Sequence, residues 1–418
     1  MIRASALSIV IVISLVIAIL CSSLIVTAYY YRAEYQKKFR YDQLQNNLGS
    51  GINILLTTSD STYKREKICS LFNQDNDSVS LKTVTWGIYN VGVAKAFIQH
   101  DTLYKTFTIG NTIDSAKWAA LYIVDEDRPV SVSGKTMIRG DAYIPNAGII
   151  ASSIDTKVYD GDKRIIIGKK FDSKKILPYL DTIKLMELNK YFSLKGDSVL
   201  NTDSVKRSFL QPTKIFDFHN EVHALRHISL DGNIILHSDT TVIIDSTAHL
   251  TNVLVFAKKI VIKSKFKGTC QLFARDSILI EKDCNFKYPS CLGILCFNLE
   301  QNKINPQIKL DSNINFCGTI FTYQKIKGDM PPAITMGKNI VISGQIYSQG
   351  SVDLLAPGEV NGSLFTAGIS YRNNYKYFNG YLIDVKIDSK SLSRYYLTSD
   401  ILPVASKREK ILQWLEGN

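Results

Sequence analysis

The chain has 418 residues, of which 45% are hydrophobic and 21% charged, and its formal net charge at pH 7 is +12. This composition supports a sizeable buried core and excludes wholesale disorder. Because the basic residues are spread along the chain rather than clustered, we expect no nucleic-acid partner. The charge equally suits anionic lipid or acidic envelope polysaccharide.

The chain begins with an uncharged stretch over residues 4–31, rich in Ile, Val, Leu and Ala. About 20 apolar residues suffice to cross the hydrocarbon layer of a bilayer. The stretch is longer than the apolar region of a cleaved signal peptide and lacks its small-residue end. Tyr29, Tyr30 and Tyr31 fit the aromatic belt where a helix leaves the membrane. The sequence therefore predicts one transmembrane anchor, residues 1–31, with the lipid bilayer as the partner of residues 4–31.

An amphipathic continuation of this helix is predicted over residues 32–56. Its apolar side chains recur at near-helical spacing: Tyr35, Phe39, Leu44, Leu48, Ile52 and Leu55. We expect the pair Gly49 and Gly51 to kink or end the helix. A helix of about fifty residues is about 75 Å long. This layout resembles the long first helix of type IV pilins and minor pilin-like proteins, although no Glu stands early in its apolar stretch.

The charges that flank the anchor give two readings of its orientation. Arg3 precedes the span, whereas Arg32, Lys37, Lys38 and Arg40 follow it. A literal positive-inside count places the body in the cytoplasm. The pilin resemblance implies the opposite, since pilin bodies face outward. We expect an inner (plasma) membrane protein that crosses once, with a periplasmic or extracellular body.

Residues 57–127 are predicted to form a smaller β-rich region. A short patch, Lys64–Phe72, is expected to be helical. His100 and Asp101 are expected to form a tight turn between two of the strands. The predicted strands are Thr83–Tyr89, Val91–Gln99, Leu103–Ile109 and Trp118–Val124.

A repeated phrase, glycine followed by apolar or β-branched residues and an aromatic, sets the expected fold of residues 128–370. It occurs at Gly318–Phe321, Gly344–Tyr347, Gly362–Phe365 and, more loosely, Gly268–Phe273, and an earlier segment ending in Phe256 matches its end. We expect the wide gap between Phe273 and Phe321 to hold an extra turn built from Leu292–Phe297. Stacked short strands of this kind predict a mainly β protein with a parallel, right-handed β-helix or solenoid. Glycines would lie at the corners and aromatics in the interior, and an antiparallel sandwich is the alternative.

Further segments are assigned by the same rhythm. Residues 130–145 are interpreted as the first turn of the stack, which makes residues of about 160–227 an insertion with an amphipathic helix at Ser173–Tyr191. Residues 371–418 are predicted to supply a C-terminal strand, Tyr381–Ile387, and a capping helix. That helix is expected to begin at Ser406, with Glu409 completing a capping box. A partner-binding role is the alternative for it.

The repeats resemble those of the polymer-forming, bactofilin-like class of β-solenoids, which are structural modules. The combination of anchor and repeats also looks like single-pass envelope proteins of Bacteroidota. These resemblances imply a structural role without cofactors.

Three histidines, His219, His223 and His227, share a spacing of four residues, with Glu221 nearby. The pattern differs from H-E-x-x-H because the acid lies two residues after the first histidine. The segment leads into a β-prone run, and in an extended chain residues four apart are separated by about 13 Å. We therefore expect no metal site.

Five aspartates are candidates for polysaccharide cleavage, the activity of known β-helix enzymes: Asp245, Asp276, Asp283, Asp311 and Asp353. They are isolated and mostly stand next to Ser, Asn or Lys, as turn residues do. None of the seven cysteines forms a C-x-x-C pair. A disulfide framework stays open, but we expect buried free thiols, because a chain of this size does not need covalent staples. No catalytic, cofactor-binding or metal-binding residue is assigned.

The function predicted from these features is a non-enzymatic, membrane-anchored structural or scaffold protein of the bacterial cell envelope. Its expected partners are envelope proteins or further copies of itself. One alternative is a pilin-like minor subunit of a surface filament or secretion machine. The other is a β-helix polysaccharide-modifying enzyme, which would carry several carboxylates within about 5–9 Å of one another.

Overall fold

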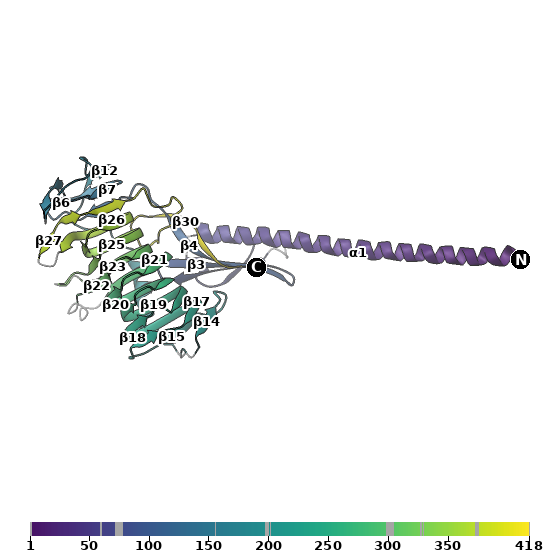
Figure 1. The fold of residues 1–418 in the computed structure, drawn as a ribbon. Coiled ribbons are helices and arrows are strands. Elements are labelled where there is room, and N and C mark those ends of the chain that lie inside the picture. Colours follow the sequence, from purple (N-terminus) through teal and green to yellow (C-terminus); the bar gives the residue numbers. More distant parts are fainter. Residues whose placement is uncertain are drawn as a thin grey trace. The chain divides into compact units, whose positions relative to one another are not determined.

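The structure is a computed structural model that describes residues 2–58, 61–71, 78–154, 156–196, 200, 202–297, 305–326, 328, 330–372 and 376–417. It is mainly β, with one long N-terminal helix (Figure 1). The chain divides into two compact units, which are described separately. The first comprises residues 1–84, 92–106 and 416–418, and the second comprises residues 85–91 and 107–415.

Helix α1, Ile2–Thr57, is continuous over 56 residues, or about 84 Å at 1.5 Å per residue. The polar side chains within its apolar part bond back to the helix itself. For example, the Ser22 hydroxyl donates to the Ala18 carbonyl at 2.7 Å, and the Thr27 hydroxyl donates to Ser23 at 2.8 Å. Such internal bonds leave little polar surface to be satisfied by a solvent, so the segment suits an apolar medium.

The predicted apolar stripe of α1 is buried only in its later part. Leu44, Leu48, Ile52 and Leu55 are at most 8% exposed, whereas the earlier Tyr35 and Phe39 of the stripe are at least 60% exposed. The stripe is therefore divided into an exposed segment and a packed one.

The expectation that Gly49 and Gly51 end or kink the helix is wrong, because α1 runs through both to Thr57. A Cβ atom on Gly51 would lie 2.9 Å from the Leu81 side chain. Gly51 therefore allows the neighbouring strand to approach closely, which is a packing role rather than a breaking one.

One sheet has the strand order β1-β2-β3-β4-β30. Three of the predicted strands correspond to β2, β3 and β4, although a turn at Gly87 and Ile88 divides the predicted Thr83–Tyr89. The fourth, Trp118–Val124, contains β5, Leu121–Ile123, which pairs with strands of the second unit instead. The turn expected at His100 and Asp101 lies one residue earlier, at Gln99 and His100. The bounds are β1 Lys67–Ser70, β2 Ser78–Trp86, β3 Tyr89–Ile98, β4 Asp101–Ile113 and β30 Ala405–Gly417.

Two helices predicted for this sheet are strands instead. The patch Lys64–Phe72 contains β1, which pairs antiparallel with β2, and only Phe72 lies outside the described residues. The C-terminal capping helix expected from Ser406 is β30, the strand next to β4 in the sheet. In both segments hydrogen bonding to an available sheet edge outweighs a local helical preference.

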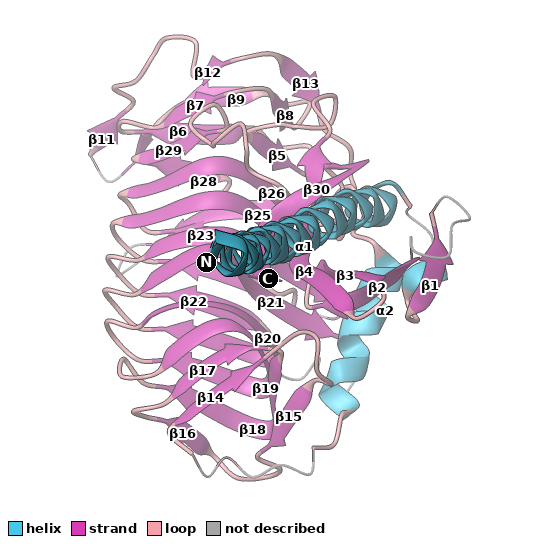
Figure 2. Cartoon of the chain, turned by 90° about the vertical axis from the view of Figure 1, so that its right-hand side faces the viewer, coloured by secondary structure: helices cyan, strands magenta, loops and turns pink. Residues whose placement is uncertain are grey.

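The central strands of the second unit pair in parallel, rung upon rung (Figure 2), so the antiparallel sandwich is wrong. Three of the four repeated phrases are in register, since Gly318 pairs with Gly344 and Gly344 with Gly362, whereas Gly268 of the looser phrase pairs with Phe286. The rungs are β17 Ser229–Gly232 with β18 Ile234–Ile244, β19 His249–Ile262, β20 Lys267–Ile280, β21 Asn285–Cys296 with β22 Gln307–Leu310, β23 Asn315–Gln324 with β24 Ala333–Met336, β25 Ile340–Leu354, and β26 Gly358–Arg372.

The extra turn expected between Phe273 and Phe321 is present. Strand β21 lies between β20 and β23, and its Gly293 pairs with Phe273 on one side and Phe321 on the other. The aromatic position of the phrase is thus filled by glycine in this rung.

The segment at 130–145 belongs to the stack but is not its first turn. Beyond β26 comes a rung made of β5 Leu121–Ile123 and β29 Val385–Asp388, two segments far apart in sequence. The next rungs follow in parallel: β7 Met137–Arg139 with β8 Ala142–Ile144, and then β12 Ile166–Ile167 with β13 Lys170–Asp172. Residues 121–172 therefore extend the end of the stack that follows the last repeat.

The predicted insertion, about 160–227, is also largely part of the stack. Besides β12 and β13, it contains three strands that pair in parallel with β17 and β18: β14 Ser204–Arg207, β15 Lys214–Asp217 and β16 His223–Leu225. Between β13 and β14 lies helix α2, Thr182–Lys190, followed by a 3-10 turn at Tyr191–Ser193. The helix is shorter than predicted. It begins after Asp181, whose carboxylate caps it by accepting from the Lys184 N–H, and Pro178 lies before this cap.

The remaining short strands complete the architecture. Three pair in parallel as a separate sheet of order β28-β6-β9, and two other pairs are antiparallel, β10 with β11 and β26 with β27. Their bounds are β6 Val130–Ser133, β9 Ile149–Ala151, β10 Ser153–Ile154, β11 Lys157–Val158, β27 Tyr377–Asn379 and β28 Tyr381–Ile383.

The interior of the stack is filled by aliphatic columns rather than by the aromatics of the repeated phrase. One interior column runs Val255, Leu272, Leu292, Ile320, Ile346, Leu364 and Leu121, all fully buried. Because side chains alternate along a strand, the adjacent aromatics point to the opposite face. The prediction that they fill the interior is wrong for this column.

All seven cysteines lie in the described part of the chain and are free thiols. Cys270, Cys284, Cys291 and Cys296 are buried, as expected for thiols that pack as small apolar side chains. Burial raises the pKa of Cys270 to about 12 and that of Cys284 to about 11. These thiols therefore stay protonated and poorly nucleophilic.

Candidate functional site

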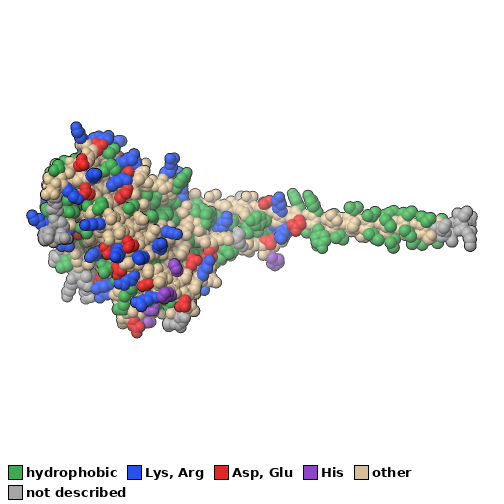
Figure 3. Space-filling model, in the orientation of Figure 1, with side chains coloured by type: hydrophobic (Ala, Val, Ile, Leu, Met, Phe, Trp, Pro, Cys, Tyr) green, Lys and Arg blue, Asp and Glu red, His purple; other side chains and the backbone are tan. Residues whose placement is uncertain are grey.

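The first candidate site is the N-terminal part of α1. The structure contains one helix long and apolar enough to cross a membrane within the residues it describes. Hydrophobic side chains surround the helix here (Figure 3), and Leu7, Ile13 and Leu20 are all more than half exposed. A helix that is apolar all round and not covered by protein is suited to burial in lipid.

The second candidate site is the outer face of the stack, where the aromatics form a column that Gly293 interrupts at one rung. Successive members are in register or in ring contact, with Phe256 and Phe273 stacked 4.8 Å apart and Tyr143 and Phe171 stacked 5.0 Å apart. The column runs Phe256, Phe273, Gly293, Phe321, Tyr347, Phe365, Tyr122, Tyr143 and Phe171.

The segment of residues 176–193, which contains α2 and is called the cover below, packs over this aromatic column. The Tyr191 ring stacks on Phe256 at 5.0 Å, and the Phe192 ring meets Phe256 edge-on at 5.2 Å. Further along, the Tyr347 hydroxyl donates to the Pro178 carbonyl at 2.9 Å. Burial raises the pKa of Tyr191 to about 12. The cover and the column therefore form a second apolar layer outside the stack.

His237 continues the column below Phe256 and was not singled out from the sequence. Its Nδ1 lies 2.9 Å from an Asp217 carboxylate oxygen, and its Nε2 lies 3.1 Å from the Phe192 carbonyl oxygen. Both partners are acceptors, so a ring nitrogen of His237 that carries hydrogen can donate to either contact. The pKa of Asp217 is lowered, because hydrogen bonds and the His237 charge outweigh its burial. The contact between His237 and the Phe192 carbonyl joins the cover to the stack.

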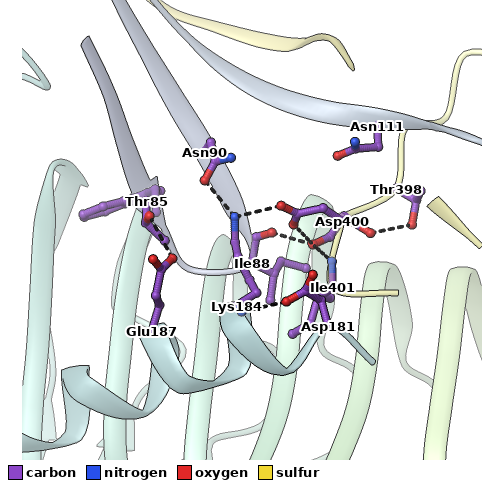
Figure 4. Close-up of polar contacts among 12 residues, drawn as sticks. Thr85, Ile88, Asn90, Asn111, Asp181, Lys184, Glu187, Thr398, Asp400 and Ile401 are labelled. Carbon is purple, nitrogen blue, oxygen red and sulfur yellow. Dashed lines mark hydrogen bonds and ion pairs between the residues drawn. The ribbon is translucent and has the colours of Figure 1, made fainter. Parts of the chain in front are cut away.

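A polar cluster fixes α2 to its surroundings in the second unit (Figure 4). The buried Lys184 ammonium donates to Asn90 Oδ1 at 2.7 Å and to Asp400 Oδ2 at 3.2 Å. The backbone N–H of Asp181 donates to the Ile401 carbonyl at 3.0 Å. A buried ammonium is costly without such partners. This cluster therefore depends on three segments that are remote in sequence.

Glu409 of β30 belongs electrostatically to this cluster. Its pKa is raised from 4.5 to about 7, first by burial and then by the Asp400 charge, and Lys184 opposes the shift. The pKa of Glu409 is higher in the folded chain than in the unfolded one. Its contribution to the free energy of unfolding is therefore fully present below about pH 4.5. The contribution is lost as the pH rises through about 7.

We expect Glu409→Gln to raise the free energy of unfolding relative to the parent protein increasingly between pH 5 and pH 8. The gain should reach about 1–2 kcal/mol, since the partial exposure of the carboxylate screens its interactions. Urea denaturation of the full-length protein in detergent at both pH values measures it. Glu126→Gln, at an exposed carboxylate, is the control. A stability difference for Glu409→Gln that does not change with pH contradicts the assignment.

The three histidines considered for a metal lie in separate local structures. His219 is in a turn with φ of 47°, His223 lies on β16 and stacks on Phe218, and His227 follows β16 with φ of 52°. Within the described ranges, no group of three or more His, Cys, Asp and Glu side chains could hold a metal ion.

Four of the five aspartates that are candidates for catalysis accept hydrogen bonds from nearby turns or rungs. The Asp245 carboxylate accepts from the Thr247 N–H at 3.1 Å, Asp311 accepts from the Ser312 N–H at 2.8 Å, and Asp353 accepts from the Ser370 hydroxyl. Asp283 has a φ of 62° and accepts from the Asn313 amide at 3.1 Å. These contacts are those of turn and ladder residues.

Asp276 differs from the other four because it is only 3% exposed, and burial raises its pKa. Its nearby cation is Lys258, with Nζ 4.0 Å from Oδ2. The other groups that shift the pKa of Asp276 are cations, Lys258, Lys259 and Arg275, whereas glycoside hydrolysis uses a pair of carboxyl groups.

The outer side of the cover carries an exposed apolar row. Ile176, Tyr179, Ile183 and Met186 are each more than half exposed, while Leu177, Leu180, Leu185 and Leu188 on the same segment are buried. The segment is thus apolar on two faces, one of which packs on the aromatic column. Clustered exposed apolar side chains of this kind are typical of interaction surfaces.

Comparisons with known proteins give little further information. No protein-family model matches the chain, and none of the curated proteins matches it. Among solved structures, the chain is similar to one described as the crystal structure of competence-associated pilin ComZ from Thermus thermophilus. The similarity has a TM-score of 0.23 and 8% sequence identity, and it covers 85% of this chain and 86% of that one. At this TM-score it carries no argument about fold or function.

Proposed function

We propose that the protein is a non-enzymatic, membrane-anchored scaffold of the bacterial cell envelope, with its body on the periplasmic or extracellular side of the inner membrane. The observation that carries the proposal is the uncharged run of residues 4–31, exposed from residue 6 onward and joined through the packed part of α1 to a β-rich body. A tether of this kind confines the body to the membrane surface.

The proposed structural module is a right-handed β-helix formed by the parallel rungs. A rigid stack offers long faces and two terminal edges, formed by β12 and β13 at one end and by β14, β15 and β16 at the other. Terminal strand edges and the exposed row of the cover are surfaces on which envelope proteins or further copies can bind. A scaffold uses such surfaces without carrying out chemistry.

The anchor is tested by placing charge in the middle of the helix. We expect the double substitution Ile13→Arg and Ile17→Arg to move the protein from the membrane pellet to the soluble fraction after alkaline carbonate washing. Each arginine at the centre of a span costs about 2.5–3.5 kcal/mol on translocon scales. Ile13→Leu with Ile17→Leu is the control and should stay in the pellet. Retention of the arginine variant in the pellet would contradict a transmembrane anchor.

The side of the membrane is tested by fusing alkaline phosphatase, or a reporter active only in the cytoplasm, after residue 418. Alkaline phosphatase activity is expected. Activity of the cytoplasmic reporter alone would refute the proposed location while leaving the anchor intact.

A pilin-like filament subunit is the second candidate, favoured by one feature of the first unit. The same helix that is exposed in its first half buries Leu44, Leu48, Ile52 and Leu55 in its second half. A filament subunit should be recovered in sheared surface filaments, whereas an isolated scaffold should remain with the membrane.

A further inference from the structure

A cavity of about 360 Å³ lies in the first unit, beside the part of α1 that follows the uncharged run. Tyr41, Leu44 and Leu103 contribute apolar surface to it. The rest of the lining is polar or charged, with Glu34, Lys37 and Lys38 on α1 and Asp101 and Thr102 on β4. The site therefore combines an apolar wall with two cations.

The position of the two lysines along α1 relates them to the membrane surface. Lys37 is six residues beyond Tyr31, where the uncharged run ends, which is about 9 Å along the axis. The headgroup layer of one leaflet is about 5–8 Å thick. Side chains of a helix tilt towards its N-terminus, which for α1 is the direction of the lipid. Long lysine stems that point this way bring their ammonium groups to the level of the phosphates.

The charges around the cavity favour an anion. The Asp101 carboxylate is already paired with Arg40, with Nε to Oδ2 at 2.9 Å. Counting Arg40 with the lining groups, three cations face two anions, so the site has a net charge of +1. One phosphodiester carries a single negative charge and matches this surplus.

We propose that this cavity binds the headgroup of an anionic phospholipid, with the phosphate held by Lys37 and Lys38 and the headgroup alcohol, which lies on the side of the phosphate away from the acyl chains, beside Tyr41. The proposal rests on the membrane anchor of the proposed function. It gives the first unit a specific contact with the bilayer in addition to the span. Free phosphate shares the charge of this ligand but lacks the acyl chains that place a lipid at this depth.

The test uses the full-length protein in lysophosphatidylcholine micelles, titrated with phosphatidylglycerol and analysed by native mass spectrometry. We expect one phosphatidylglycerol per chain. The double variant Lys37→Gln/Lys38→Gln should bind it about 30-fold more weakly, at roughly 1 kcal/mol per lysine. Both lysines are exposed, so the fold should be unaffected. The matched control is Lys169→Gln/Lys170→Gln, an adjacent exposed pair in the second unit, which should bind like the parent.

Two outcomes overturn the proposal. One is equal binding of phosphatidylglycerol by the parent and the Lys37/Lys38 variant. The other is displacement of the lipid by an equal concentration of glycerol phosphate, which assigns the site to free phosphate. All variants should float with liposomes after carbonate washing, because the span is unchanged. Failure of the parent to float refutes the anchor and the lipid site together, whereas flotation without selective binding refutes the lipid site alone.

Discussion

Replacement of Gly344 by alanine is expected to destabilise the parallel stack by on the order of 3–5 kcal/mol. Gly344 has a φ of 151°, and a Cβ atom there would lie 1.9 Å from the Gly318 carbonyl oxygen. A Cβ on Gly362 would likewise lie 1.8 Å from the Gly344 carbonyl oxygen. The obstacle is backbone on the adjacent rung, which cannot rotate away as a side chain can. Urea denaturation followed by circular dichroism measures the loss.

Gly368→Ala is the matched control, because Gly368 lies on β26 next to the Gly344 rung and a Cβ there would meet nothing within 4 Å. It should change the free energy of unfolding by less than about 1 kcal/mol. If Gly344→Ala proves as mild as this control, close backbone approach between the rungs is not what the repeated glycine provides.

The same glycines show why the register of the central rungs was predictable. A position that tolerates only glycine, followed at a fixed distance by an aromatic, marks the same place in each rung even when the connecting loops differ in length. Gly318, Gly344 and Gly362 consequently align, as do Phe321, Tyr347 and Phe365. The long apolar run at the N-terminus was predictable for a similar reason, since its lack of charge is a local property.

The order of the rungs was not predictable, because parallel pairing does not require sequence neighbours. Leu364 of β26 pairs with Leu121, and Ile387 pairs with Ile138. No local pattern shows that a segment before the repeats completes the end after them. Strand β30 was predicted as a helix for the same reason. The capping-box pattern of Ser406 and Glu409 indicates only a local helical preference and gives no sign of the pairing with β4.

The polar contacts of the cover were missed for a related physical reason. Lys184 meets Asn90 and Asp400, which are 94 and 216 residues away in sequence. Asp217 and His237 are separated by only 20 residues, but their contact depends on the register of adjacent rungs. The aromatic residues were identified correctly, whereas the face they occupy was not. An alternating strand with apolar side chains on both faces does not show which face is inside.

The aromatic column predicts the second large effect. Phe256→Ala is expected to cost about 3–5 kcal/mol, the usual range for a buried phenylalanine. Phe256 is fully buried and contacts the rings of Tyr191, Phe192 and Phe273. The loss should be concentrated in the cover, because the interior aliphatic columns are untouched. Hydrogen exchange should therefore rise in residues 182–193 at lower denaturant than in β19 and β20.

Phe171→Ala is the control at the far end of the same column, where the ring stacks on Tyr143 but is 40% exposed. Its cost should stay near 1 kcal/mol, since part of the apolar surface is already in contact with water. Equal costs for the two substitutions would mean that stacking along the column, rather than burial under α2, stabilises it. Exchange that rises uniformly through the stack in Phe256→Ala would instead show that cover and stack unfold as one cooperative layer. Only a large, local effect at Phe256 fits a cover that packs on the stack as a separate layer.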